Sequence, residues 1–249
     1  MVRSFLAITE NQVLLKTHPM NVHLKNKSCR LCQSGDETLT HVLTSCPQTI
    51  SNFGKERHDK VTRVLWKELL KKFGFKYIPK SKIYENDNVK ILWDFKHEVE
   101  NKLYHTKPDI TIVDKTNNKV ILCETAISMY ELMKSQQEIK KIRYTVNGEI
   151  EINHLNYKSV KHGENLRNIL LRNGFNDVIF IPLIVSTSGE ILNETKTEII
   201  KLLGKNPKYL RHMWTNMGSN ALAVSHRMLK RVFGHKISSS KDKLGKLSV

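Results

Sequence analysis

The sequence is poor in acidic residues and has no long hydrophobic run. Asp and Glu number 24 against 41 Lys and Arg, which gives the 249 residues a formal charge of +17. No run approaches the roughly 18 apolar residues of a transmembrane helix, and the apolar patch near the first residues is too short for a secretory signal. A hydrophobic fraction of 39% is too high for a disordered chain, so we expect a soluble globular protein with a buried core.

The shortage of negative charge is greatest towards the end of the sequence. Residues 201–249 contain eleven Lys or Arg and one acid, Asp242. A positive surplus attracts polyanions, nucleic acid before an acidic membrane. Arg227, Lys230 and Arg231 are therefore candidate phosphate contacts. A basic surface that only keeps the protein soluble is the alternative.

Cysteine is also scarce, and three of the four cysteines lie close together. The spacing is Cys29-x2-Cys32-x8-His41-x4-Cys46. Three thiolates and one imidazole satisfy tetrahedral Zn²⁺ and leave no open position, so the sequence predicts a structural zinc knuckle in a reducing compartment. Without the metal this segment has too little core to fold alone. Cys123 lies in an apolar run and is expected to be a buried small hydrophobic residue.

Hydrophobic periodicity predicts a mixed α/β fold. Helices are expected at residues 59–73, 88–103, 129–144, 162–173, 190–203 and 207–233, and strands at residues 109–113, 120–124 and 178–185. Asn147-Gly148 predicts a hairpin turn, Pro182 indicates a strand end, an edge or a bulge, and the residues from His235 onward are expected to be mobile. The order predicts a small mixed sheet flanked by helices. We expect a segment 1–56 with the knuckle, a domain 57–204, and a basic helical region 205–249.

Two carboxylates are predicted to meet at one end of the sheet. Asp109 opens one predicted strand and Glu124 closes the next, and the Asn117-Asn118 turn joins the two strands. Two carboxylates at one sheet end suit Mg²⁺, which keeps its other positions for water and phosphate oxygens. A metal held there can activate water and neutralise the charge of a phosphodiester.

Four motifs follow one another along the chain: the Cys-x2-Cys-x8-His-x4-Cys knuckle, Arg57-His58-Asp59, Lys107-Pro108-Asp109 with Glu124, and Lys141-x2-Tyr144. This order resembles the C-terminal region of site-specific non-LTR retrotransposons that carry a restriction-like endonuclease. The resemblance covers roughly residues 20–185. One element of the restriction-like signature Pro-Asp…Glu-x-Lys departs from the pattern, because Ala126 stands where the Lys belongs.

The resemblance implies a restriction-endonuclease-like fold and a metal-dependent DNA endonuclease. Asp109 and Glu124 become the ligands of Mg²⁺ or Mn²⁺, Lys141 becomes the catalytic lysine, and Tyr144 an accessory group. Lys140 competes with Lys141 for the catalytic role, and only the spacing to Tyr144 favours Lys141.

The resemblance also implies further contacts and partners. Glu98, on the helix before the first strand, is a candidate third carboxylate, with a surface acid as the alternative. Lys107, Arg57, His58 and Lys140 are candidate nucleic-acid contacts. The enzyme would nick double-stranded DNA in the nucleus and leave a 3′-hydroxyl for reverse transcription, with element RNA and the reverse transcriptase domain as partners and no membrane.

Other interpretations remain. The chain has no Asp-Asp pair for a polymerase box, so we expect a fragment, a truncated copy or a domain that acts alone. The alternatives to an active nuclease are a catalytically silent DNA- or RNA-binding module and a protein-binding scaffold.

Overall fold

A computed structural model describes residues 8, 13–99, 105–145, 149–152, 157–161 and 165–244. A five-stranded mixed sheet in the order β1-β2-β3-β4-β7 forms its centre. The pairs β1–β2, β2–β3 and β3–β4 are antiparallel, β7 runs parallel to β4, and β5 and β6 form a separate antiparallel pair. The strands are β1 (Ile83–Glu85), β2 (Val89–Trp93), β3 (Ile110–Asp114), β4 (Lys119–Ser128), β5 (Glu149–Ile152), β6 (Tyr157–Lys161) and β7 (Asp177–Ser186).

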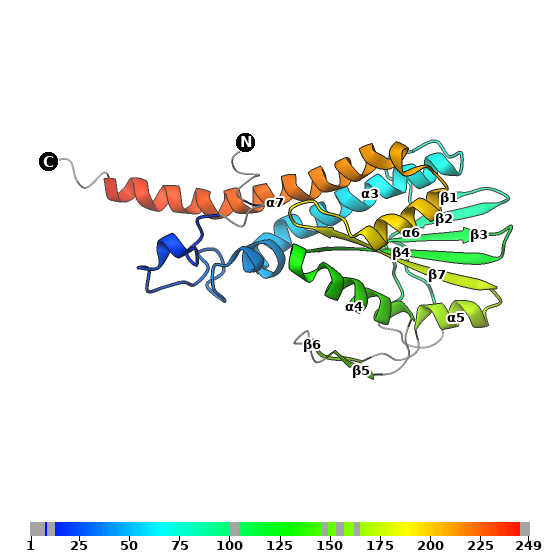
Figure 1. Ribbon diagram of the computed structural model, residues 1–249, viewed down its shortest axis with the longest axis horizontal. Helices are drawn as coiled ribbons and strands as arrows, with labels where there is room; N and C mark the ends of the chain where they lie inside the picture. Colours follow the sequence, from blue (N-terminus) through cyan, green and yellow to red (C-terminus); the bar gives the residue numbers. More distant parts are fainter. Residues whose placement is uncertain are drawn as a thin grey trace.

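Helices cover both faces of the sheet (Figure 1). α3, α6 and α7 lie on one face, and α4 and α5 lie on the other. The long helices are α3 (Lys55–Lys72), α4 (Met133–Thr145), α5 (Leu166–Arg172), α6 (Asn193–Leu203) and α7 (Pro207–Leu244). The short helical segments are η1 (Pro19–Asn21), η2 (His41–Ser45), α2 (Pro47–Thr49), η3 (Ile50–Gly54) and η4 (Tyr130–Leu132). This arrangement confirms the predicted mixed sheet flanked by helices.

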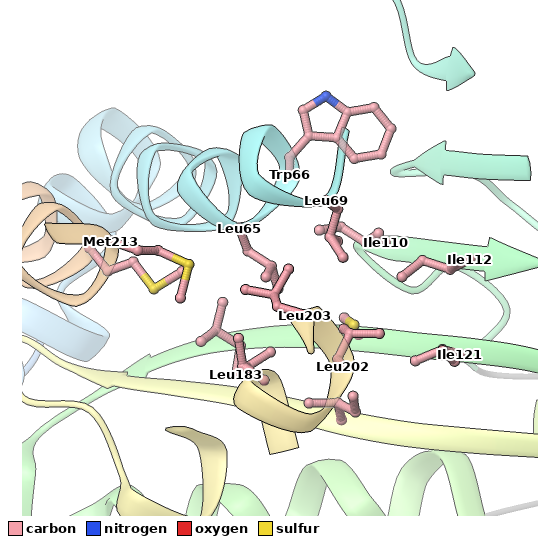
Figure 2. Packing of buried hydrophobic residues seen from close by; sticks show 14 of the residues in the cluster. Leu65, Trp66, Leu69, Ile110, Ile112, Ile121, Leu183, Leu202, Leu203 and Met213 are labelled. Carbon is pink, nitrogen blue, oxygen red and sulfur yellow. The ribbon is translucent and has the colours of Figure 1, made fainter. Parts of the chain in front are cut away.

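The main core lies between the sheet and the helices α3, α6 and α7. Figure 2 shows Leu65 and Leu69 of α3 facing Ile110 and Ile112 of β3, with Leu203 of α6 beside them. Each fully buried aliphatic side chain stabilises the fold by roughly 1.5–3 kcal/mol relative to an exposed one. A smaller core on the opposite face packs α4 and α5 against β4 and β7. The apolar strands β4 and β7 are therefore covered on both faces.

A third core joins the knuckle to α7. Leu39, Val42 and Leu43 of the knuckle pack with Met228 and Val232 of α7. The first half of α7 meanwhile contributes Met213, Met217 and Ala221 to the main core. α7 thus connects the knuckle with the sheet.

The turn after β7 touches α7 at a contact that requires two glycines. Gly189 has a positive φ of 103°, and a Cβ built on it would lie 2.8 Å from the carbonyl oxygen of Gly218 in α7. A Cβ on Gly218 would lie closer than 3.0 Å to the carbonyl oxygen of Gly189. Since real Cβ atoms essentially never approach so closely, any larger residue pushes the turn and the helix apart.

Several predicted elements differ from the structure. The helix expected at residues 88–103 is wrong, because residues 89–93 form β2 between β1 and β3. The two-residue hairpin at Asn147-Gly148 is also wrong, since residues 144–145 belong to α4 and β5 pairs with β6, although the dipeptide itself lies outside the described residues. α7 continues to Leu244, beyond the expected end at residue 233, so residues 235–244 are helical where we expected mobility.

The other elements agree with the sequence analysis. The helix expected at residues 59–73 is α3, the strands at residues 109–113 and 120–124 are β3 and β4, and residues 178–185 lie within β7. β7 is an edge strand, as Pro182 indicated. Among the described helices, none has both the length and the hydrophobicity that crossing a membrane demands.

Candidate functional site

The four predicted zinc ligands converge on one point. Their ligand atoms all lie within 4.8 Å of one another. The sulfur atoms of Cys29 and Cys46 are 3.9 Å apart, and Sγ of Cys32 is 3.2 Å from Nε2 of His41. Zn–S bonds of about 2.3 Å in a tetrahedron give a sulfur–sulfur separation of about 3.8 Å, whereas a disulfide needs about 2.05 Å. The geometry of this Cys₃His cluster therefore fits zinc.

The local backbone explains why the ligands meet. The amide of Gln33 donates to the carbonyl of Cys29 at 2.9 Å and closes the turn that carries Cys29 and Cys32. The amide of Cys46 donates to the carbonyl of His41 at 2.6 Å and closes a turn that brings these two ligands together. Gly35 leaves room for the imidazole, since a Cβ there would lie 3.3 Å from Nδ1 of His41. The sequence spacing thus matches the turns that it adopts.

The thiols of the cluster differ in acidity. Burial raises the pKa of Cys29 to about 11, since the thiolate would lie in a low-dielectric interior without a neutralising cation. Desolvation acts in the same direction on Cys32, but hydrogen bonds from Ser34 and His41 outweigh it and lower the pKa of Cys32 to about 6. A bound zinc would supply the positive charge that the buried thiolates need.

Two buried charged side chains, Glu37 and Arg57, hold the knuckle in place. The carboxylate of Glu37 is fully buried and receives hydrogen bonds from the side chain and the amide of Arg30. Arg57 of α3, only 3% exposed, donates to the carbonyl of Leu43 at 2.7 Å and to the hydroxyl of Ser225 in α7 at 3.1 Å. Burial lowers the pKa of Arg57 to about 10. Arg57 therefore joins α3, the knuckle and α7, and it does not reach the surface that a phosphate contact requires.

The second site lies at one end of β3 and β4. Ile110 pairs with Cys123 in the antiparallel ladder, so Asp109 and Glu124 face each other across it. The amide of Asp109 lies 3.3 Å from Oε2 of Glu124. The side chain of Asp109 is 15% exposed and that of Glu124 is 14% exposed. The two carboxylates are thus adjacent and only partly buried.

α4 brings a lysine and a tyrosine to Glu124. Nζ of Lys140 lies 2.7 Å from Oε1 of Glu124, and the hydroxyl of Tyr144 donates to Oε2 at 3.4 Å. Residues four apart share one face of a helix, which explains why Lys140 and Tyr144 reach the same carboxylate. Lys141, assigned the catalytic role by the resemblance, is exposed on α4. Between the two competing lysines, the structure brings Lys140 to the carboxylates.

α3 supplies the partner of Asp109. Nε2 of His58 lies 3.0 Å from Oδ2 of Asp109, and Nδ1 of His58 lies 3.1 Å from Oδ1 of Asp59. The amide of Thr125 donates to the same Asp109 oxygen at 2.6 Å. The hydroxyl of Thr62, one turn beyond His58, donates to the hydroxyl of Thr125 at 2.8 Å. His58 thus orients a carboxylate, while the nucleic-acid contact expected of it stays a prediction.

Burial and mutual repulsion govern the electrostatics of this site. Desolvation, and then the charge of Asp109, raise the pKa of Glu124, while Lys140 and His58 act against them. Burial and the charge of Glu124 also raise the pKa of Tyr144, which keeps the phenol protonated. Burial opposes the positive charge on His58, but Asp109 and Asp59 outweigh it and raise its pKa. Lys140, and His58 when it is protonated, therefore place positive charge beside the two carboxylates.

Asp109 and Glu124 are the residues that could hold a magnesium ion. Glu98 is exposed in the segment after β2, where the helix expected to present it is absent. Among the described residues, the zinc cluster is the only group of three or more His, Cys, Asp or Glu side chains placed to hold a metal. A magnesium ion would therefore take two protein carboxylates and complete its shell with water or substrate oxygens.

The remaining predicted nucleic-acid contacts lie on the surface. Lys107 forms an ion pair with Asp94 at 2.7 Å. Arg227 pairs with Glu56 and lies over the ring of Phe53, and Lys230 and Arg231 are exposed on α7. The sequence analysis did not single out Asp94, whose carboxylate pairs with Lys107 and whose amide donates to the carbonyl of Asp109 at 2.7 Å. Asp94 has a positive φ of 50°. Nothing in the neighbouring sequence indicates that it contacts Asp109.

Comparison with models of known protein families gives no match for this chain, and comparison with curated proteins gives none either. The described residues offer two candidate sites, a Cys₃His cluster that could bind zinc and a pair of carboxylates with a lysine beside them.

Proposed function

We propose that the chain is a metal-dependent DNA endonuclease of the restriction-like type. The observation that carries the proposal is the meeting of Asp109, Glu124 and the ammonium of Lys140 at one sheet end. Bound Mg²⁺ would activate a water and offset the charge of a phosphodiester. The formal charge of +17 supports a polyanionic substrate.

Each side chain of the site has a task in this proposal. His58 and the amide of Thr125 hold Oδ2 of Asp109, which keeps the carboxylate in one orientation. Lys140 stabilises the negative charge that grows on the phosphate oxygens during attack. Tyr144 donates to Glu124 and keeps it aligned. The attacking water gives up a proton to the solvent and its oxygen forms a bond to phosphorus, while the bond from phosphorus to O3′ breaks. O3′ takes a proton from the solvent, which leaves a 5′-phosphate and a 3′-hydroxyl.

The biological setting belongs to the same proposal. In a non-LTR retrotransposon that 3′-hydroxyl would prime reverse transcription in the nucleus, with element RNA and a reverse transcriptase domain as partners. The order of the knuckle, His58, Asp109, Glu124 and the helix with Tyr144 supports this setting.

A catalytically silent nucleic-acid-binding module is the second candidate. One observation favours it: Oδ2 of Asp109 and both oxygens of Glu124 already have partners within the chain. A metal ion or a substrate would have to displace some of these contacts. The two candidates differ in one property, cleavage that depends on a divalent metal.

Nicking of supercoiled plasmid with Mg²⁺ or Mn²⁺ tests the proposal. Asp109→Asn should abolish nicking, and Lys140→Met should slow it by about 100-fold or more, the scale on which one charge-stabilising donor acts. Lys141→Met is the matched control, because it removes the neighbouring, exposed lysine and should nick at the wild-type rate. Loss of nicking in Lys141→Met with full nicking in Lys140→Met would overturn the assignment of the lysine. An intact chain that binds DNA without nicking it is the silent module.

A further inference from the structure

A pocket beside α3 combines aromatic rings with positive charge. Its volume is about 280 Å³, and neither Asp109 nor Glu124 lines it. None of the described residues that line it is acidic. The lining residues are Arg63, Trp66, Tyr77, Pro79, Lys80, Ser81, Lys82 and Trp93.

The aromatic wall of this pocket is fixed by packing. Trp66 is 2% exposed and lies at the rim of the main core (Figure 2). Its ring meets that of Trp93 edge-on, with centroids 5.5 Å apart. The hydroxyl of Tyr84 accepts from the amide of Ile78 at 2.7 Å and donates to its carbonyl at 3.1 Å. These bonds hold the loop that carries Tyr77, so the rings are in place before any ligand arrives.

Two cations beside the pocket lie over aromatic rings. The guanidinium of Arg63 lies 6.0 Å from the ring centre of Trp93, and Nζ of Lys67 lies 5.0 Å from that of Tyr77. Lys80 is exposed at the mouth with a positive φ of 68°. A nucleic-acid base can stack on such rings, and its phosphate can pair with the neighbouring cations, so the chemistry of the pocket suits a nucleotide. The volume, at the low end of small-molecule sites, accommodates one such unit and excludes a duplex.

The pocket lies close to the carboxylates along two routes. Trp93 pairs with Ile110 in the ladder between β2 and β3, and the next residue, Asp94, donates its amide to the carbonyl of Asp109. On α3, His58 and Trp66 are separated by about 12 Å along the axis at 1.5 Å per residue. That distance corresponds to about three or four nucleotides of one DNA strand. A strand that passes the carboxylates can therefore reach the pocket.

We propose that this pocket binds one unpaired nucleotide of a single-stranded nucleic-acid segment, its base against Tyr77 and Trp93 and its phosphate on Arg63 and Lys80. The assignment rests on the proposed nucleic-acid function, and it adds a site that holds a single strand next to the carboxylates. The nuclease would then prefer a target with unpaired nucleotides a few positions from the cleaved bond.

Fluorescence anisotropy of a labelled 12-nucleotide oligothymidine tests the pocket, with the full zinc-loaded chain and no added divalent metal. Tyr77→Ala should weaken binding by about fivefold or more, since one base–aromatic stack is worth at least that factor. The matched control is Tyr209→Ala, which removes an 80%-exposed ring at the start of α7 and should leave the affinity within about twofold. Lys80→Glu, a second variant at an exposed position, should weaken oligothymidine binding and reduce its salt dependence.

The outcomes separate the pocket from the nuclease. Equal affinities of Tyr77→Ala and Tyr209→Ala for oligothymidine would overturn the proposal, as would equal losses on oligothymidine and on a blunt-ended duplex. Competition by thymidine monophosphate as strong as by the oligonucleotide would identify a free nucleotide as the ligand and overturn the strand assignment. Since the assay does not read cleavage, a chain that never nicks can still show the Tyr77 dependence, and a chain that nicks can lack it.

Discussion

Gly218 tests the contact between α7 and the turn after β7. In Gly218→Ala the new methyl would lie closer than 3.0 Å to the carbonyl oxygen of Gly189 and 3.3 Å from its carbon, whereas ordinary contact begins at 3.4 Å. Both neighbours are backbone, so the helix and the turn must separate by about 0.5 Å or more, with the side chains packed behind them. Such overpacking costs about 1–3 kcal/mol, and the better helix propensity of Ala returns up to about 1 kcal/mol.

The same helix offers the matched control. Gly234 has no atom within 4 Å of a built Cβ, so Gly234→Ala should leave the free energy of unfolding unchanged or raise it by up to about 1 kcal/mol. Thermal unfolding followed by circular dichroism at constant zinc measures both variants. A net loss of about 2 kcal/mol lowers Tm by roughly 4–8 °C for a chain of this size. If Gly218→Ala melts at or above the temperature of Gly234→Ala, the close approach is not present in solution.

The zinc cluster and two buried charged residues give further expected outcomes. Cys46→Ser should lose the bound zinc, measured by atomic emission, while Cys123→Ala keeps it; equal zinc content in the two variants contradicts the cluster. Arg57→Met should lower the free energy of unfolding in urea by about 2 kcal/mol, because two buried acceptors lose their donor. Arg63→Met, on the exposed side of the same helix, loses only a contact with the ring of Trp93 and should change it by less than about 1 kcal/mol. Burial of Glu37 opposes its negative charge, but hydrogen bonds and the charge of Arg30 outweigh burial and lower the pKa of Glu37. The contribution of Glu37 to the free energy of unfolding is therefore present above the ordinary glutamate pKa of about 4.3 and is lost as the pH falls below that value. The stability difference between wild type and Glu37→Gln should therefore shrink as the pH falls below about 4.3, and a constant difference from pH 7 down to about pH 3 would refute this.

The helices and strands whose hydrophobic residues follow one clear period could be predicted from the sequence. α3 and β3 each carry one dominant repeat, of helical and of strand type respectively. Residues 89–93 could not be assigned, because Val89, Leu92 and Trp93 fit a helical face as well as a strand. Their neighbours in the sheet decide the outcome, since β2 pairs on both sides. Pairing between distant segments overrides a weak local pattern.

The site could be predicted in its charged members but not in its geometry. The zinc ligands and the facing of Asp109 and Glu124 follow from spacing and from strand order. The choice between Lys140 and Lys141 depends on the rotation of α4 about its axis, which packing of Tyr144 against Phe180 helps to set. The aromatic pocket could not be predicted, because its walls come from α3, β2 and the loop between α3 and β1.

Arg57 and His58 are consecutive residues, yet they serve different sites. Arg57 binds the carbonyl of Leu43 in the knuckle, and His58 binds the carboxylate of Asp109. A ligand that fixes the knuckle also restricts this first turn of α3 and, through it, the orientation of Asp109. Such coupling would be reciprocal. If bound zinc changed the affinity of the carboxylates for a cation by some factor, that cation would change the affinity of the cluster for zinc by the same factor. The two sites thus share the first turn of α3.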